Sequence, residues 1–115
     1  MPIQTEQNVF EDMGGVYDTL KERELWPMMA VHPKIVPEDP HWHIQNNHIF
    51  VVEGEAEFHD VEADIWHKLS AGDICYIPRR TLHAIRADGP VVFIAAFDEA
   101  MRMTEFVPYP PAALS

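Results

Sequence analysis

The sequence contains very little cysteine and little positive charge. Cys75 is the only cysteine among 115 residues, which excludes an internal disulfide and fits a reducing compartment. Eight lysines and arginines stand against nineteen aspartates and glutamates, so the formal net charge is −11. Such an acidic surface repels phosphate backbones and anionic lipids. We therefore expect neither nucleic acid nor a membrane surface as a partner.

Long hydrophobic runs are lacking as well. The longest, Val91–Phe97, is far too short to cross a bilayer. Residues 1–7 lack the basic start and apolar stretch of a signal peptide. These two features predict a cytoplasmic protein. A length of 115 residues fits one domain with a single hydrophobic core.

Short apolar stretches broken by turn residues fill the chain between residues 25 and 107. They recur roughly every eight to twelve residues, a spacing typical of all-β sandwiches and barrels. The strand candidates are residues 28–31, 35–36, 42–44, 48–52, 56–59, 65–69, 74–77, 82–86, 91–97 and 101–107. Residues 37–40, Pro-Glu-Asp-Pro, predict a turn. Because no pattern of long helices accompanies these stretches, the sequence predicts an all-β domain.

The two ends of the chain differ from this middle part. Residues 1–24 predict an N-terminal arm, of which the polar residues 1–14 are loosely held. Residues 16–24 fit two turns of helix, with Val16 and Leu20 on one side, and fit an edge strand equally well. Residues 108–115 form a proline-rich C-terminal tail. We therefore expect one barrel domain flanked by two short segments.

The sharpest chemical feature is the pair His41 and His43, separated by Trp42. Along a strand, residues two apart project from the same face, so both imidazoles can reach one metal ion. Trp42 then points the other way, into packing or an interface. Taken alone, the pair fits two ordinary surface histidines equally well. A third histidine, His83, follows Pro78 at the start of a strand candidate, where a barrel can fold it back against the pair.

The sequence around these histidines resembles the two motifs of the cupin superfamily, G-x5-H-x-H-x3/4-E-x6-G and G-x5-P-x-G-x2-H-x3-N. The positions in register are His41, His43 and Gly54 in the first motif, and Gly72, Pro78 and His83 in the second. The two motifs cover residues 41–87. The resemblance implies a double-stranded β-helix, which is the jelly-roll barrel of cupins.

The resemblance also implies one divalent metal ion bound by His41, His43 and His83. Iron is the leading candidate, and zinc, nickel, manganese or copper would fit the same nitrogens. Three imidazoles leave positions on the ion open for water, substrate or dioxygen. This arrangement resembles the three-histidine iron cupins that cleave diketones or aromatic acids. A neutral ligand set also leaves the full charge of the ion available to a chelating anion.

Several motif positions carry other residues. Ile35, Arg80 and Ala87 replace two glycines and an asparagine, and turn positions of this kind vary easily. The motif glutamate falls on Asn47, or on His48 under the alternative spacing. Neighbouring strand residues point to opposite faces, so only one of these two can face the cavity. We favour Asn47 as a fourth, neutral ligand and keep His48 as the alternative.

The resulting functional hypothesis is a metal-dependent dioxygenase acting on a small diketone or carboxylic acid. Two alternatives stay open: a non-catalytic domain that binds or senses a small molecule, and a metal-assisted isomerase, lyase or cyclase. Gln45 and Tyr76 are weaker candidates for contact with the substrate. No further catalytic residue can be assigned.

We also expect a homodimer paired by sheet edges, because pairing covers exposed strands. Trp26, Trp42 and the N-terminal segment are the candidates for that contact.

Overall fold

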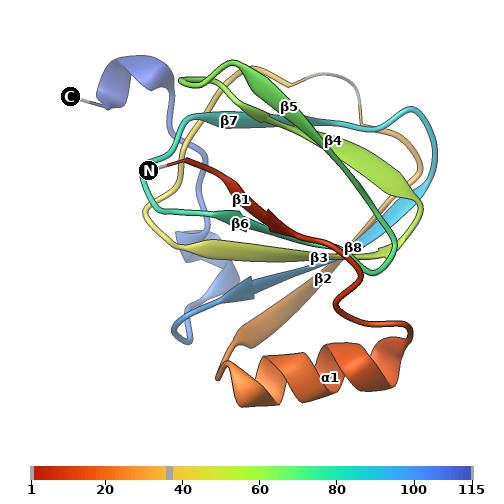
Figure 1. Ribbon diagram of the computed structural model, residues 1–115. Helices are drawn as coiled ribbons and strands as arrows, with labels where there is room; N and C mark the ends of the chain where they lie inside the picture. Colours follow the sequence, from red (N-terminus) through yellow and green to blue (C-terminus); the bar gives the residue numbers. More distant parts are fainter. Residues whose placement is uncertain (1, 36–37, 115) are drawn as a thin grey trace.

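Two antiparallel sheets face each other in the computed structural model, which describes residues 2–35 and 38–114 (Figure 1). Side chains are described for all of these except residues 30–32 and 103. The strands in chain order are β1 (Gln4–Glu6), β2 (Trp26–His32), β3 (Asn47–Glu53), β4 (Glu55–Asp60), β5 (Ile65–Ser70), β6 (Ile74–Ile77), β7 (His83–Arg86) and β8 (Val91–Phe97). The predicted all-β architecture is therefore confirmed.

The larger sheet has the strand order β1-β6-β3-β8-β2, and the smaller one the order β5-β4-β7. Strands adjacent in the sheets are often distant in the chain, as when β3 pairs with both β6 and β8. The inward-facing side chains of both sheets form the main hydrophobic core, which includes Ile49, Phe58 and Phe93. Alternate residues of β3 lie on opposite faces. Ile49 therefore joins the inner core, while Phe50 joins a second core on the outer face of the sheet.

Helix α1 (Met13–Glu22) covers that outer face, below the larger sheet in Figure 1. It begins at Asp12, whose side chain caps the helix by accepting a hydrogen bond from Gly15 N at 3.0 Å. Val16 and Leu20, one turn apart, are buried against Phe50 and its neighbours. Of the two alternatives that the sequence left open here, the structure shows the helix.

The N-terminal residues are not loosely held, contrary to the expectation for residues 1–14. Strand β1 pairs with β6, with Gln4 opposite Tyr76. Ile3 is 5% exposed within the inner core, and its backbone N donates to Asp60 Oδ2 at 3.0 Å. The expectation failed because two buried hydrophobic residues, Ile3 and Phe10, and a strand edge anchor a segment that is mostly polar.

Two other strand candidates also differ, and a third lies partly outside the described residues. Residues 101–107 contain a 3-10 helix, η1 (Met103–Glu105), in place of a final strand. Residues 42–44 form no regular strand; the segment makes isolated bridges, His41 with His83 and Trp42 with Tyr109. Ile35 bridges Ala87, but the rest of the 35–36 candidate and the start of the 37–40 turn lie outside the described residues.

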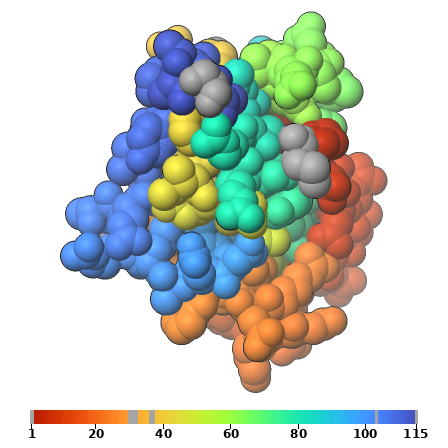
Figure 2. All heavy atoms as spheres, turned by 90° about the vertical axis from the view of Figure 1, so that its left-hand side faces the viewer, coloured from red at the N-terminus to blue at the C-terminus, as the bar shows by residue number. Residues whose placement is uncertain are grey.

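The C-terminal segment, residues 106–111, packs along one end of the domain and leads into η2 (Pro111–Ala113). In Figure 2 this blue part of the chain lies directly against the yellow segment that leads into β3. Tyr109 exchanges two backbone hydrogen bonds with Trp42, and the two rings stack with centroids 4.7 Å apart. Trp42 Nε1 also donates to Pro110 O at 3.0 Å. Because Trp42 is only 5% exposed, it cannot serve as the dimer contact that the sequence suggested.

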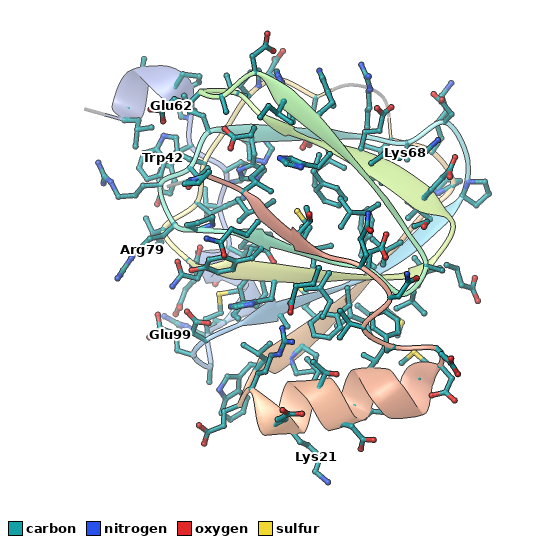
Figure 3. All side chains as sticks on the ribbon, in the orientation of Figure 1. Lys21, Trp42, Glu62, Lys68, Arg79 and Glu99 are labelled. Atoms are coloured by element: carbon teal, nitrogen blue, oxygen red, sulfur yellow. The ribbon has the colours of Figure 1, made fainter. Side chains whose placement is uncertain are left out.

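Most charged side chains lie on the outside of the domain, whereas Asp60 and Asp73 are buried. Those labelled in Figure 3, such as Lys21, Lys68 and Glu99, point away from the space between the sheets. In the described part of the chain, no helix has the length and apolar character needed to span a membrane.

Candidate metal centre

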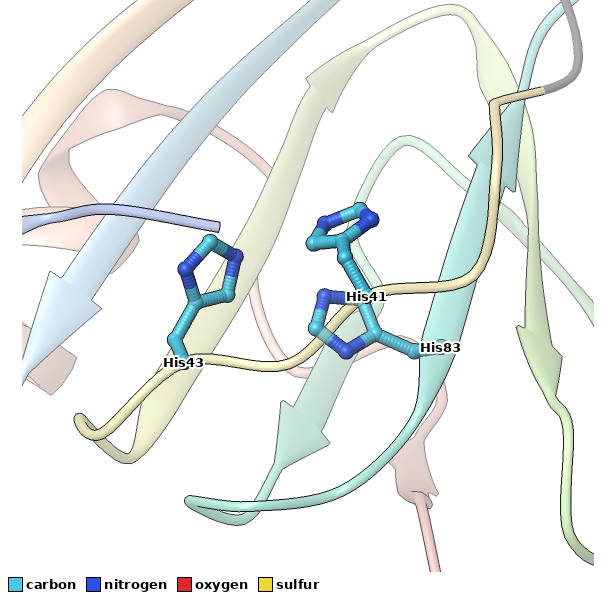
Figure 4. Close-up of side chains that lie close together, drawn as sticks. All are labelled: His41, His43 and His83. Carbon is cyan, nitrogen blue, oxygen red and sulfur yellow. The ribbon is translucent and has the colours of Figure 1, made fainter. Parts of the chain in front are cut away.

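The structure brings His41, His43 and His83 together at one end of the space between the sheets (Figure 4). His83 is the first residue of β7, and His41 lies beside it because the two residues exchange backbone hydrogen bonds of 2.9 and 3.0 Å. His43 follows two residues after His41 on the segment that leads into β3. The ring centroids lie 4.4 Å apart for His41 and His83, 5.0 Å for His41 and His43, and 5.3 Å for His43 and His83.

Backbone carbonyls fix the orientation of all three rings. His41 Nδ1 lies 3.0 Å from Asp39 O, and His83 Nδ1 lies 2.8 Å from Thr81 O. His43 Nδ1 lies 2.9 Å from Val107 O. A carbonyl oxygen can only accept, so each Nδ1 carries the proton and donates. The Nε2 lone pairs are then left to face one another, and one ligand nitrogen from each ring lies within 4.8 Å of the others.

Burial keeps two of these rings neutral near pH 7. It lowers the pKa of His43 to about 4 and that of His83 to about 3, and the neighbouring His41 lowers both pKa values further. The carbonyl partners of the two rings oppose this effect only in part. A neutral imidazole with a protonated Nδ1 and a free Nε2 is the form that binds divalent metals. The three histidines therefore fit a divalent cation without any change of protonation at His43 or His83.

Asn47 and His48 point in opposite directions. Asn47 lines the same cavity as the three histidines and is 5% exposed. Its Oδ1 atom is buried and has no hydrogen-bond partner among the described residues. Burying such an oxygen costs free energy unless a partner binds it, and a cation beside the histidines would be one. His48 lies on the outer face of β3, where Nε2 is 2.7 Å from Asp98 Oδ1.

A cavity of about 960 Å³ opens in front of the histidines. Most of its wall is apolar and comes from both sheets and from the C-terminal segment. The hydrophobic residues in this wall are Met28, Ile35, Ile49, Ile85, Phe93, Ala95, Phe106 and Tyr109, with Pro40, Pro108, Pro110 and Pro111. Its polar residues, besides the histidines, are Glu38, Asp39 and Asn47. This size and lining suit a small organic ligand held by few polar contacts.

The two weaker candidates from the sequence, Gln45 and Tyr76, are not among the described residues that line this cavity. Gln45 is 8% exposed and donates through Nε2 to Glu105 O at 2.8 Å, so it fastens the C-terminal segment. In a regular strand Gln45 would project from the same face as His43, but residues 42–44 do not form one. Tyr76 lies on the outer face of β6 with its ring 4.7 Å from that of His48.

Sequence reasoning missed two cavity residues that touch the histidines. Phe106 stacks on the ring of His43, with centroids 4.1 Å apart and planes inclined by 18°. Glu38 places Oε1 3.8 Å from His41 Nε2. The sequence prediction assigned residue 38 only to a turn. Nothing in the sequence indicated that the C-terminal segment reaches the histidines.

The family is shown by comparison with known proteins. The family model for the cupin domain matches residues 27–97, well over half of the chain. This chain therefore belongs to the cupin family, and the predicted double-stranded β-helix is confirmed. Among curated proteins, none matches.

Solved structures with the same fold include two enzymes of stated activity and a further cupin-domain protein. A dimethylsulfoniopropionate (DMSP) lyase from Ruegeria pomeroyi, DddQ, is 25% identical, with a TM-score of 0.61 over 76% of this chain and 43% of the lyase. A cupin 2 domain-containing protein from Halorhodospira halophila is 20% identical, with a TM-score of 0.58 over 95% of this chain and 68% of the other. A variant of Bacillus subtilis oxalate decarboxylase is 19% identical, with a TM-score of 0.56 over 68% of this chain and 22% of the decarboxylase. The chain thus spans less than half the length of either enzyme.

Proposed function

We propose that this cupin is a metal-dependent enzyme acting on a small molecule that carries a carboxylate or a diketone. One observation carries the proposal: three histidine nitrogens within 4.8 Å of one another face an apolar cavity of about 960 Å³. Histidines held by backbone carbonyls form a rigid ligand set, which is what a catalytic metal site needs. Three protein nitrogens also leave positions on the ion for a substrate.

The residues of the chain have distinct parts in this proposal. His41, His43 and His83 hold the ion through Nε2, and the Oδ1 atom of Asn47 supplies a neutral oxygen beside them. A bound divalent ion would polarise an oxygen of the substrate and stabilise negative charge that develops on it. The apolar wall, with Phe106 over His43, excludes water from the bound substrate and so strengthens electrostatic contacts in the site.

The reaction class that we propose first is a dioxygenase, with iron as the metal. Neutral imidazole ligands suit iron, and a site with several open positions can accept both a chelating substrate and dioxygen. A lyase is the second candidate, and the 25% identity with a DMSP lyase over 76% of this chain favours it. Both candidates need a small substrate that binds the ion through oxygen atoms, and they differ in their need for dioxygen.

Metal content and oxygen consumption test the proposal. Elemental analysis of the purified protein should find about one transition-metal ion per chain. His83→Ala should remove this ion, because the substitution deletes a buried, oriented ligand and leaves only two histidines in the site. His67→Ala is the matched control, since His67 lies on β5 outside the three-histidine group. Equal metal binding by His83→Ala and the unaltered chain would contradict the proposed site.

Turnover separates the two reaction classes. The iron-loaded protein should consume oxygen with one or more members of a panel of diketones and small carboxylic acids. A lyase would release its product from a carboxylic acid under anaerobic conditions. Tight binding of panel members without turnover in either experiment would contradict both classes and would instead indicate a binding or sensing domain.

A further inference from the structure

We propose that Glu38 supplies the carboxylate ligand that this chain lacks at the usual position of the cupin motif. The inference rests on the proposed metal site and adds one ligand to it. Asn47, at the motif position, offers only a neutral amide oxygen, so three histidines and Asn47 give the ion no negative charge. Glu38 lies on the other side of the His41–His43 pair in the sequence and reaches the same cavity.

Among the described residues, two contacts place the Glu38 side chain beside His41 and strand β7. Oε1 accepts a hydrogen bond from Ile85 N at 2.8 Å, and the same oxygen lies 3.8 Å from His41 Nε2. Ile85 is two residues after His83 on β7, and both of their side chains line the cavity. The carboxylate of Glu38 is therefore tied to the strand that carries one histidine and lies against the ring of another.

As a ligand, the carboxylate of Glu38 has to turn toward the ion when the ion binds. Two ligands each at roughly 2.0–2.1 Å from a tetrahedral zinc ion lie about 3.3 Å apart. The observed 3.8 Å between Oε1 and Nε2 exceeds this, and among the described residues the group of ligand atoms within 4.8 Å of one another contains the three histidines and not Glu38. A carboxylate has two oxygens, so one can keep the hydrogen bond to Ile85 while the other approaches the ion.

The charge of Glu38 distinguishes a metal ligand from a structural cap. As a cap on Ile85 N, residue 38 needs only an acceptor oxygen, and a glutamine would serve equally well. As a metal ligand it needs its negative charge, because that charge compensates the divalent ion in a cavity wall that is mostly apolar. Glu38→Gln keeps the first property and removes the second.

Titration with Co²⁺ and Zn²⁺ tests the assignment on the unaltered chain and three variants. Glu38→Gln should bind both ions at least about tenfold more weakly, and the visible absorption of bound Co²⁺ should change in intensity and position. Its thermal unfolding without metal should match that of the unaltered chain, because the hydrogen bond from Ile85 N remains. Glu57→Gln is the matched control: its side chain is 34% exposed, against 35% for Glu38, and it should bind as the unaltered chain does.

The third variant, Glu38→Ala, removes both the acceptor and the charge, and should bind as weakly as Glu38→Gln. If Glu38→Gln binds as tightly as the unaltered chain, Glu38 is not a ligand and the three-histidine site stands without it. The same conclusion follows if only Glu38→Ala is impaired. If the unaltered chain binds neither ion, the proposed function and this inference both fail.

Discussion

The Nδ1 atom of His43 lies 2.9 Å from the carbonyl oxygen of Val107, which is 64 residues further along the chain. Phe106, the preceding residue, covers the ring of the same histidine. The orientation of one proposed metal ligand thus depends on a segment that follows the last strand. Metal affinity should therefore respond to changes in the C-terminal segment, although the segment offers no ligand of its own.

Phe106→Ala should weaken metal binding. The substitution removes the stacking on His43 and the contact with Phe97, whose ring centroid lies 5.0 Å away. The carbonyl of Val107 then loses its fixed position, and we expect the dissociation constant for Zn²⁺ to rise by about tenfold. Calorimetric titration measures this change. Val107→Ala is the control, because it keeps the carbonyl and alters only a side chain that is 39% exposed. Equal losses in both variants would contradict the role of the ring.

The stability of the metal-free protein should fall as the pH is lowered from about 6.5 toward 4. The pKa of His83 is about 3 and that of His43 about 4 in the folded chain, both below the ordinary value of 6.5. In this pH window the unfolded chain binds protons that the folded chain excludes, so protonation favours unfolding. Above pH 6.5 neither state protonates these groups, and their contribution becomes constant. The free energy of unfolding should fall by a few kcal/mol at pH 4, which is the order of magnitude that the two pKa shifts correspond to.

Chemical denaturation at several pH values measures this dependence. In His83→Gln, which keeps a polar side chain but does not titrate, the free energy of unfolding should vary less between pH 6.5 and pH 4. Glu6, whose pKa the Arg23 guanidinium lowers, contributes in the same direction in both proteins and cancels in the comparison. A pH dependence that is unchanged in His83→Gln would show that His83 is accessible to protons in the folded chain.

The fold could be predicted from the sequence because its strands follow one another with clear turn signals. The turn at Gly72 is an example, since φ is +102° there and favours glycine. Arg80 shows the limit of motif reasoning. It occupies a glycine position of the cupin motif and still has φ of 60°, the left-handed region, with its guanidinium 5.2 Å from the centroid of the Trp42 ring. Position 80 therefore keeps the left-handed backbone conformation, although arginine replaces the glycine of the motif.

The site was predictable only where the motifs cover it. The motifs named the three histidines, and the motif spacing counted from Gly54 favoured Asn47 over His48. The strand prediction for residues 101–107 was wrong because their apolar pattern resembles a strand. The C-terminal part of the chain is instead held by hydrogen bonds from the side chains of Trp42 and Gln45. Glu38 could not be placed because its position depends on a hydrogen bond to Ile85, 47 residues away. Contacts between segments without regular structure leave no periodic pattern in a sequence.

Gly54→Ala should destabilise the protein strongly. Gly54 joins β3 to β4 with φ of +80°, and a Cβ there would lie 2.2 Å from the carbonyl oxygen of Pro90. Both the conformation and the clash with backbone oppose any side chain, so we expect a loss of roughly 2–4 kcal/mol. Gly89→Ala is the control, since a Cβ at that position meets nothing within 4 Å. Thermal unfolding of both variants checks the prediction, and similar melting temperatures would contradict it.

Strand β2 should form the contact of a homodimer. It is an edge strand of the larger sheet, and two of its side chains are unusually exposed for their size: Trp26 at 56% and Met29 at 57%. Long hydrophobic edge strands tend to pair with another chain, and two copies of one strand can pair antiparallel around a twofold axis. Trp26→Asp should therefore shift the protein from dimer to monomer in sedimentation equilibrium. Ile65→Asp, on an edge of the smaller sheet at 49% exposure, should leave the mass unchanged. A monomeric mass for the unaltered chain at every concentration would exclude this pairing.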